Sequence, residues 1–118
     1  MKGKMITISN DGTVTVPDDV KMTIGEIADL LGIYYQAAKK NIRSIEKSGI
    51  ADGDYSMCCT VEGEKVYPEY YGLDMVIAVA FKVQSVRAYI FRRWLIRRIS
   101  RIGLPQAIML PLQNVMLN

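Results

Sequence analysis

Residues 23–49 read TIGEIADLLGIYYQAAKKNIRSIEKSG and contain the clearest local signals in the chain. Thr23 followed three residues later by Glu26 has the pattern of a capping box, which predicts that a helix begins here. Gly32 stands where that helix should end, because glycine enters the left-handed conformation without a steric cost. A second helix is expected after a short turn, so residues 23–48 are predicted to form a helix-turn-helix.

The second expected helix, about residues 34–48, has two unlike faces. At helical spacing, one side is made of the apolar and aromatic residues Tyr35, Ala38, Ile42 and Ile45. The other side carries amide and cationic groups, from Gln36, Lys39, Lys40, Arg43 and Lys47. Such groups suit a helix in the major groove of DNA, where amides and guanidinium groups reach base edges and ammonium groups bind phosphates. The alternative is the ordinary solvated face of an amphipathic helix.

Alternating patterns on either side of this unit predict two β-hairpins. Residues 4–16 alternate apolar and polar around the turn sequence NDG. Residues 55–61 and 65–71 flank EGE as the two strands of a second hairpin, and Pro68 places the second strand at a sheet edge because proline cannot donate to a ladder. A hairpin directly after the second helix is where a winged-helix protein carries its wing. The acidic tip argues against a phosphate contact at this point.

Two further helices are expected near the C-terminus. Residues 73–81 are almost wholly apolar, and their pattern fits a buried strand as well as a buried helix. Residues 86–102 have a clear helical period, with Ser85 as a candidate cap. Their apolar side consists of Ala88, Phe91, Leu95, Ile99 and Ile102. Their other side carries Trp94 among the arginines Arg87, Arg93, Arg97, Arg98 and Arg101.

The arginine side of residues 86–102 has three candidate partners. In order of preference these are the DNA backbone, the acidic residues between positions 48 and 81, and an anionic membrane surface. Trp94 has three readings as well: plain packing, a contact with a partner subunit, or stacking on a base or an arginine. Residues 103–118 are uncharged and rich in Leu and Met, so we expect them to dock on their own domain or to help form a homodimer.

Composition is ordinary for a folded domain, but charge is unevenly distributed. The 118 residues suit one domain, 1–118, with a net charge of +3. Residues 48–81 carry six acidic residues against Lys65, whereas residues 82–118 carry one lysine, six arginines and no acid. Such separated blocks create directed fields, which steer a protein toward a polyanion.

Several kinds of site are disfavoured by composition. The chain has no histidine, the commonest general base and metal ligand, and no nucleophile–base or metal-binding pattern. We therefore expect neither an enzyme nor a cofactor. Cys58 and Cys59 do not make a disulfide framework, which favours a reducing, cytoplasmic setting. No signal peptide and no membrane-spanning run is visible in the sequence.

Residues 65–94, KVYPEYYGLDMVIAVAFKVQSVRAYIFRRW, resemble the signature of the RhuM-type virulence-associated proteins of bacteria. That family has a tyrosine pair, a Leu-Asp-Met run, an apolar helix, a short basic turn and a helix with a Phe-Arg-x-Trp motif. The matching positions are Tyr70, Tyr71, Leu73, Asp74, Met75, Val83, Ser85, Arg87, Phe91, Arg92 and Trp94. Upstream, the fit extends through Ala28, Leu31, Gly32, Ile33 and Ile42.

The resemblance covers about residues 23–98 and has two implications. It implies a helix rather than a strand at residues 73–81. It also implies that the N-terminal part is a DNA-binding-like module, related in style to phage antirepressor regions. The chain departs from the family at Tyr34 and Tyr35, where the family tends to have a small or acidic polar residue.

Together these patterns predict an α+β fold, with a winged helix-turn-helix-like core, an N-terminal β-hairpin, a wing-like β-hairpin and two C-terminal helices. The predicted function is DNA binding by a transcriptional regulator or phage antirepressor-like factor. The expected DNA contacts are Gln36, Lys39, Lys40, Arg43 and Lys47, with backbone contacts from Arg93 and Arg97. The alternative is a protein-interaction module that keeps a winged-helix shape without affinity for DNA.

Overall fold

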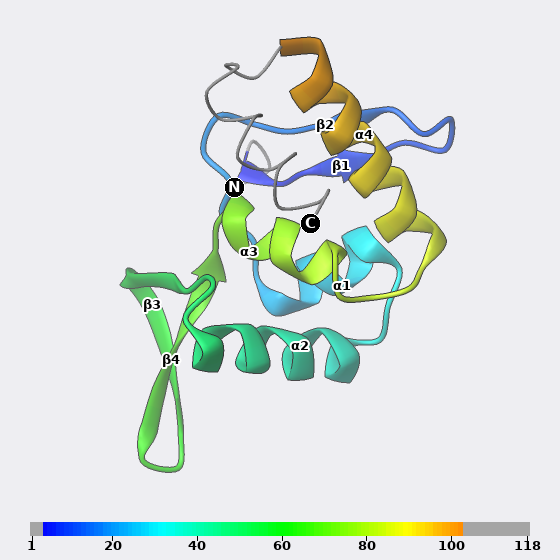
Figure 1. Ribbon diagram of the computed structural model, residues 1–118. Coiled ribbons are helices and arrows are strands. Elements are labelled where there is room, and N and C mark those ends of the chain that lie inside the picture. The colour runs from blue at the N-terminus through cyan, green and yellow to red at the C-terminus, as the bar shows by residue number, and fades with distance from the viewer. Residues whose placement is uncertain (1–3, 103–118) are drawn as a thin grey trace, which may run out of the picture.

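The computed structural model describes residues 4–102, which form an α+β fold of four helices and two two-stranded antiparallel sheets (Figure 1). The coarse fold prediction is therefore confirmed. In chain order the elements are β1 (Thr7–Ile8), β2 (Val14–Thr15), α1 (Ile24–Leu31), α2 (Tyr35–Ser48), β3 (Gly53–Glu62), β4 (Lys65–Tyr71), α3 (Leu73–Ala80) and α4 (Val86–Ile102). The expected role of residues 103–118 lies outside the described residues.

The turn between α1 and α2 has the local chemistry that the sequence predicts. The Thr23 hydroxyl accepts a hydrogen bond from the Glu26 amide at 3.2 Å, and the Glu26 carboxylate accepts one from the Thr23 amide at 2.8 Å. Gly32 ends α1 with a φ of 64°. A Cβ at this position would also lie 3.1 Å from Cδ of Arg87, so glycine suits both the conformation and the packing.

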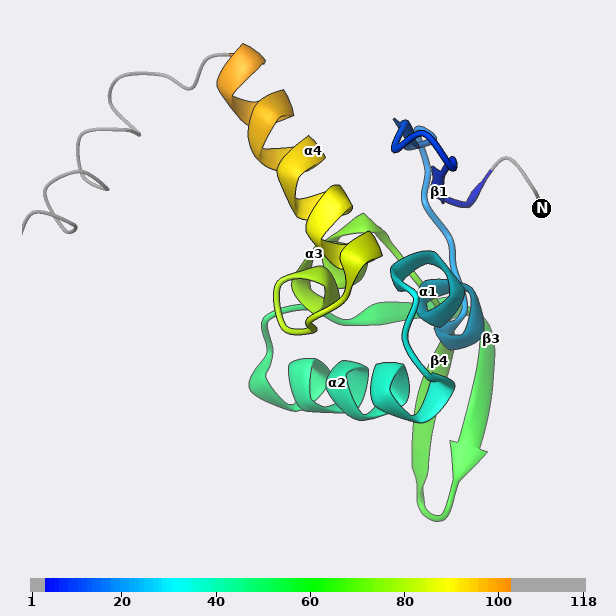
Figure 2. The ribbon, with the colours of Figure 1, turned by 90° about the vertical axis from the view of Figure 1, so that its right-hand side faces the viewer.

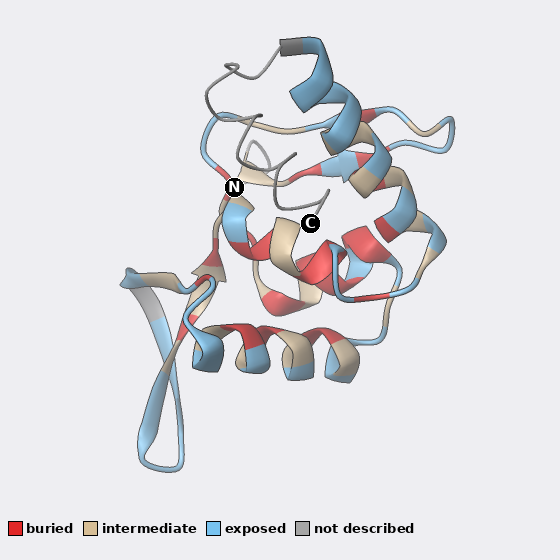
Figure 3. Cartoon of the chain, viewed as in Figure 1, coloured by how far each residue is buried: buried red, intermediate tan, exposed pale blue. Residues whose placement is uncertain are grey.

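The helices are arranged in three layers. α1 and α3 lie in the middle, α2 lies on one side of them, and α4 rises from the other side (Figures 1 and 2). The buried residues of the helices, coloured red in Figure 3, belong to one hydrophobic core. Among the most deeply buried are Ile27, Leu31, Ile42, Met75 and Phe91. As a result, α2 and α4 present their polar faces on opposite sides of the molecule.

Residues Leu73–Ala80 are helical, which excludes the strand alternative. Met75, Val76, Val79 and Ala80 are buried, and this spacing is that of one helix face. The carboxylate of Asp74 accepts a hydrogen bond from the Met75 amide at 2.9 Å in the first turn. At the other end, Arg92 donates to the carbonyl oxygens of Ala80 and Val83 at 2.6 and 3.0 Å. A side chain of α4 thus satisfies carbonyl groups at the end of α3.

α4 is anchored at its N-terminal half. The Ser85 hydroxyl accepts a hydrogen bond from the Ala88 amide at 3.0 Å and donates one to the Leu31 carbonyl. Ala88 and Phe91 are fully buried, as the period predicts. Farther along, Leu95 is only half-buried and Ile99 is 39% exposed, so packing weakens toward the end of the helix. Within the described part of the chain, no helix is long and apolar enough to cross a bilayer.

The β3–β4 hairpin projects past α2, away from the helical layers (Figures 1 and 2). Its register pairs Glu62 with Lys65, and Gly63 adopts a φ of 65° in the turn. The base of the hairpin is tied to the segment before α1. There Met22 and Tyr71 exchange two backbone hydrogen bonds of 2.9 and 2.8 Å. The start of α1 and the hairpin are therefore fixed relative to each other.

Candidate nucleic-acid interface

Three of the predicted DNA contacts are exposed to solvent on the outer face of α2. Gln36, Lys40 and Lys47 are exposed. The inner face is closed, because Ala38, Ile42 and Ile45 are buried in the core formed with α1 and α3. Figure 3 shows this division along the length of the helix. Neither Lys40 nor Lys47 forms an ion pair within residues 4–102.

Tyr35 does not belong to the buried face, which corrects the prediction from periodicity. Its side chain is 49% exposed, and Tyr34 just before it is 87% exposed. The reason is that Tyr35 lies at the edge of the apolar arc and lines a hollow of about 370 Å³ beside the hairpin. Pro68 and Glu62 form part of the same hollow. The start of α2 therefore presents aromatic groups next to Gln36.

Arg43 is bound within the protein. Its Nη1 donates to the Tyr71 hydroxyl at 2.9 Å and to the Glu46 carboxylate at 3.2 Å. Its guanidinium carbon also lies 3.7 Å from the centre of the Tyr67 ring. The Tyr71 hydroxyl in turn donates to Glu46 at 3.0 Å. These contacts fix α2 to strand β4 and leave Arg43 only 19% exposed.

The surroundings of Tyr71 keep its phenol group protonated. Burial, and then the neighbouring Glu46 carboxylate, raise the pKa of Tyr71 well above its usual range, so the phenol remains a neutral donor. The Nε atom of Arg43 is buried and has no hydrogen-bond partner among the described residues. The hydrogen bonds of Nη1 and the Tyr67 ring hold the guanidinium group in place.

Glu62, the last residue of β3, lies close to Lys39 and Arg43 of α2. Its carboxylate lies 2.9 Å from Nζ of Lys39 and 3.8 Å from Nη2 of Arg43. The hydrogen bond from Lys39 lowers the pKa of Glu62, so the carboxylate is ionised at neutral pH. Glu62, one of the two acidic residues expected at the tip, thus faces α2 and pairs with two of the residues predicted to contact DNA.

One further cation reaches the outer face of α2 from a distant part of the chain. Nζ of Lys82, in the connection between α3 and α4, lies 3.5 Å from the Ser44 hydroxyl. We call the surface made of Gln36, Lys40, Ser44, Lys47 and Lys82 the α2 face. Sequence reasoning missed Lys82 because the signal is tertiary: the connection between two later helices returns to the end of α2.

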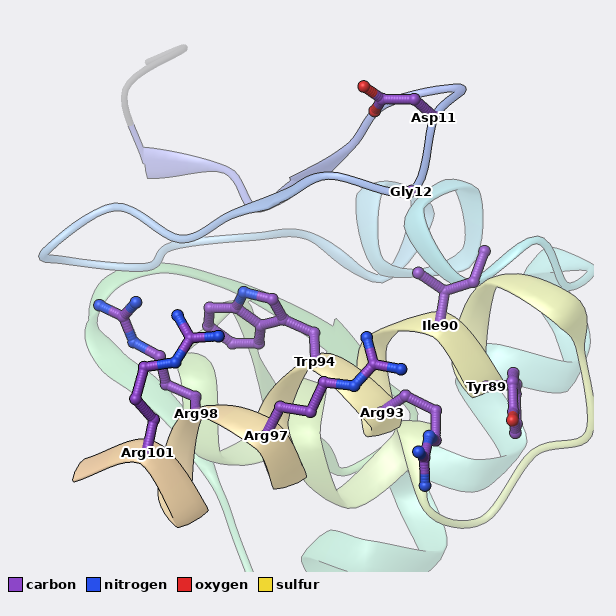
Figure 4. A pocket seen from close by; sticks show the side chains of 9 residues that line it. All are labelled: Asp11, Gly12, Tyr89, Ile90, Arg93, Trp94, Arg97, Arg98 and Arg101. Carbon is purple, nitrogen blue, oxygen red and sulfur yellow. The ribbon is translucent and has the colours of Figure 1, made fainter. Parts of the chain in front are cut away.

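Arg93 and Arg97 are exposed on α4, on the far side of the middle layer from the α2 face (Figures 1 and 2). The predicted DNA contacts therefore fall into two separate surfaces. Arg93 and Arg97 line a hollow of about 420 Å³ between α4 and the β1–β2 turn (Figure 4).

The acidic stretch does not supply partners for these arginines within the described residues. Asp54 pairs with Lys21 at 2.9 Å, and Glu62 pairs with α2. Two other arginines of α4 have internal roles instead. Arg87 donates to the carbonyl oxygens of Leu30 and Ile8, and Arg92 donates to the carbonyls at the end of α3.

Comparison with known proteins gives no match: no family model fits the chain, and neither a curated protein nor a solved structure resembles it. The resemblance to the RhuM-type proteins therefore remains a prediction. In the part of the chain that the structure describes, no three His, Cys, Asp or Glu side chains are grouped so that they could hold a metal ion.

Proposed function

We propose that this chain is a DNA-binding protein that places α2 in the major groove. In this proposal α1 and α2 are a helix-turn-helix, and the β3–β4 hairpin is the wing of a winged-helix fold. The observation that carries the proposal is the α2 face itself. Its glutamine and lysines are exposed and free of ion pairs within residues 4–102, while the opposite side of the helix is buried. A helix built in this way can enter a groove without unpacking the core.

The residues of the α2 face would have different tasks. Gln36 stands in the first turn of α2, where recognition helices approach base edges, and a glutamine amide can pair with adenine through two hydrogen bonds. Lys40, Lys47 and Lys82 would bind phosphates and set the orientation of the helix. Tyr34 and Tyr35 would lie against the groove wall beside Gln36.

Lys39 and Arg43 take positioning roles in this proposal. Their contacts with Glu62 and Tyr71 hold the hairpin at a fixed angle to α2. In this proposal the hairpin supports α2 as part of the structure, because its acidic turn disfavours a contact with the DNA backbone. The proposed biological role is that of a transcriptional regulator or antirepressor-like factor, in line with the resemblance. Homodimer formation through α4 is supported by Ile96 and Ile99, which are 46% and 39% exposed.

The test is a salt titration of binding to labelled duplex DNA by the full chain, compared with two matched double variants. Lys40→Ala/Lys47→Ala should weaken binding to all sequences and reduce the slope of log K against log salt by about two, or one per lysine. Arg97→Ala/Arg101→Ala removes the same charge from α4 and should leave the slope unchanged. Equal losses in the two variants would overturn the assignment to α2. Absence of duplex binding at low salt would favour the protein-interaction module instead.

A further inference from the structure

A groove runs along α4, on the side that faces the β1–β2 turn. It has a volume of about 420 Å³, and Figure 4 shows the side chains that line it. From the turn come Asp11 and Gly12, and from α4 come Tyr89, Ile90, Arg93, Trp94, Arg97, Arg98 and Arg101. The groove lies on the other side of the molecule from the α2 face, so a ligand here would not be part of a duplex bound to α2.

The cations of the groove form a regular row. Arg93, Arg97 and Arg101 are four residues apart, so they follow one another along the helix axis at steps of about 6 Å. They are exposed, and no ion pair within residues 4–102 involves them. α4 contains no acidic residue whose charge could offset the charges of these arginines. An extended anionic ligand would match both the row and its spacing.

Two aromatic side chains line the same groove. The Trp94 ring stacks on Phe91, with 5.9 Å between ring centres and 23° between planes, and Phe91 is fully buried. Trp94 is therefore held in place by the core while part of it remains exposed. Arg98 lies 5.9 Å from the centre of the indole ring. Tyr89, nearer the start of α4, is 55% exposed.

We propose that this groove binds a segment of single-stranded nucleic acid. Its phosphates would lie on Arg93, Arg97 and Arg101, and bases would stack on Trp94 and Tyr89. A cationic groove with aromatic platforms is how proteins bind single strands without strong sequence preference. An acidic peptide would use the arginines but would leave both aromatic rings without a role. A lipid surface would need a broad apolar face beside the arginines, whereas Ile90 is the one aliphatic side chain that lines the groove, and Ile96 and Ile99 lie outside it.

Asp11 limits how a strand can lie in the groove. Its carboxylate accepts hydrogen bonds from the Ser9 hydroxyl and the Thr13 amide, which lower its pKa to about 2 and keep it ionised. It stands on the turn, across the gap from the arginines (Figure 4). A phosphate backbone should therefore run along α4 and avoid the turn. Asp11→Asn removes this repulsion and should tighten binding.

Trp94 makes the proposal testable, because it is the one tryptophan of the chain and its fluorescence reports on this groove alone. We would titrate the full chain with an oligothymidylate of about 12 nucleotides, a length within the usual range of single-strand sites. Quenching of Trp94 is expected, with a salt slope reduced by about 1.4 in Arg97→Ala/Arg101→Ala, since each phosphate contact to a single strand contributes about 0.7. Lys40→Ala/Lys47→Ala, with the same charge loss on α2, should quench like the parent protein. Tyr89→Ala should weaken binding roughly fivefold or more through lost stacking.

Three results would overturn the proposal. They are no quenching by the oligothymidylate, equal quenching by a poly-glutamate peptide of similar length, and equal quenching by vesicles of phosphatidylserine and phosphatidylcholine. The second would make the groove a site for acidic protein segments, and the third a membrane contact. Because duplex binding is followed through the labelled DNA and single-strand binding through Trp94, failure of either proposal leaves the other measurable.

Discussion

At the scale of single residues, Glu62 determines how α2 can meet a ligand. Its carboxylate contacts Lys39 and Arg43, two of the five α2 side chains expected to bind DNA. A phosphate arriving at α2 would have to compete with this carboxylate for the Lys39 ammonium group. Arg43 is held by Tyr71 and Glu46 as well, so Lys39 is the group that such competition can release.

Replacement of Glu62 should therefore strengthen binding to duplex DNA. In Glu62→Gln the Lys39 ammonium group loses its anionic partner, and we expect the salt slope to grow by about one as Lys39 gains a phosphate. The measurement is fluorescence anisotropy of a labelled duplex at several salt concentrations. Glu64→Gln is the matched control, because Glu64 stands on the other side of Gly63 and forms no ion pair among the described residues. If both variants bind alike, the contact with Lys39 does not limit affinity.

Residue patterns predicted the helix boundaries well because capping and glycine signals act locally. Thr23, Glu26 and Gly32 behave as their chemistry requires. No local sequence pattern predicts the internal contacts of Arg43 and Arg87. Each depends on a partner far along the chain, Tyr71 for Arg43 and Leu30 for Arg87. A periodic pattern assigns a side chain to a face of its helix, but it does not say what lies against that face.

At the scale of elements, the hairpin depends on a close contact at its base. A Cβ at Gly53 would lie 2.3 Å from Cγ of Pro68 and 2.9 Å from Cε1 of Tyr71. Only glycine lets β3 approach β4 so closely at this point. The register shift between Asp54 and Cys59 follows directly after it. The position of the hairpin beside α2 thus rests on a residue without a side chain.

Gly53→Ala should consequently destabilise the fold. The proline ring is rigid, so the backbone must shift, and overpacking of this kind costs about 1–3 kcal/mol in the free energy of unfolding. Urea denaturation followed by circular dichroism would measure the loss. Gly25→Ala in α1 is the control, since the nearest atom to its added Cβ is 3.9 Å away. We expect that variant to gain up to about 1 kcal/mol from helix propensity. A Gly53→Ala protein as stable as the parent would contradict the close contact.

Prediction of elements from the sequence was limited where one pattern fits two structures. The apolar run at Leu73–Ala80 gave no choice between strand and helix from periodicity, and its burial against α2, α4 and β4 explains why. A helix with neighbours on several sides has no polar face, so its hydrophobic residues show little periodicity. The same limit applies to Tyr35. Its helical spacing placed it on the apolar side of α2 but did not show that it lies at the exposed edge of that side.

At the scale of the whole molecule, the two cationic surfaces lie on opposite sides of the layer formed by α1 and α3. In the sequence, an acidic stretch separates the basic residues of α2 from those of α4. This pattern does not indicate where the two helices lie in space. Only the packing of α2 and α4 on different sides of the middle layer separates them. From the sequence alone, Lys40 and Lys47 were joined with Arg93 and Arg97 in a single interface, and Lys82 was missed.

This separation leads to a prediction that rests on both proposals. A labelled duplex bound to α2 should remain bound while an oligothymidylate quenches Trp94, because the two ligands occupy different sides of the molecule. Anisotropy of the duplex and tryptophan fluorescence can be recorded in one titration. Arg97→Ala/Arg101→Ala should lose the quenching and keep the duplex signal. Release of the duplex in proportion to the quenching would show that the ligands share one surface.

The contacts of Ser85 and Arg87 with the end of α1 also bear on how the protein is made. The hydroxyl of Ser85 and the guanidinium of Arg87 satisfy the carbonyl oxygens of Leu31 and Leu30, more than fifty positions earlier in the chain. During synthesis the first helix pair leaves the ribosome long before these two side chains do. The carbonyl groups at the end of α1 therefore stay open to water until the start of α4 has emerged. The end of α1 is completed only by residues at the start of α4, so folding of this part is expected to finish only after translation has passed Arg87.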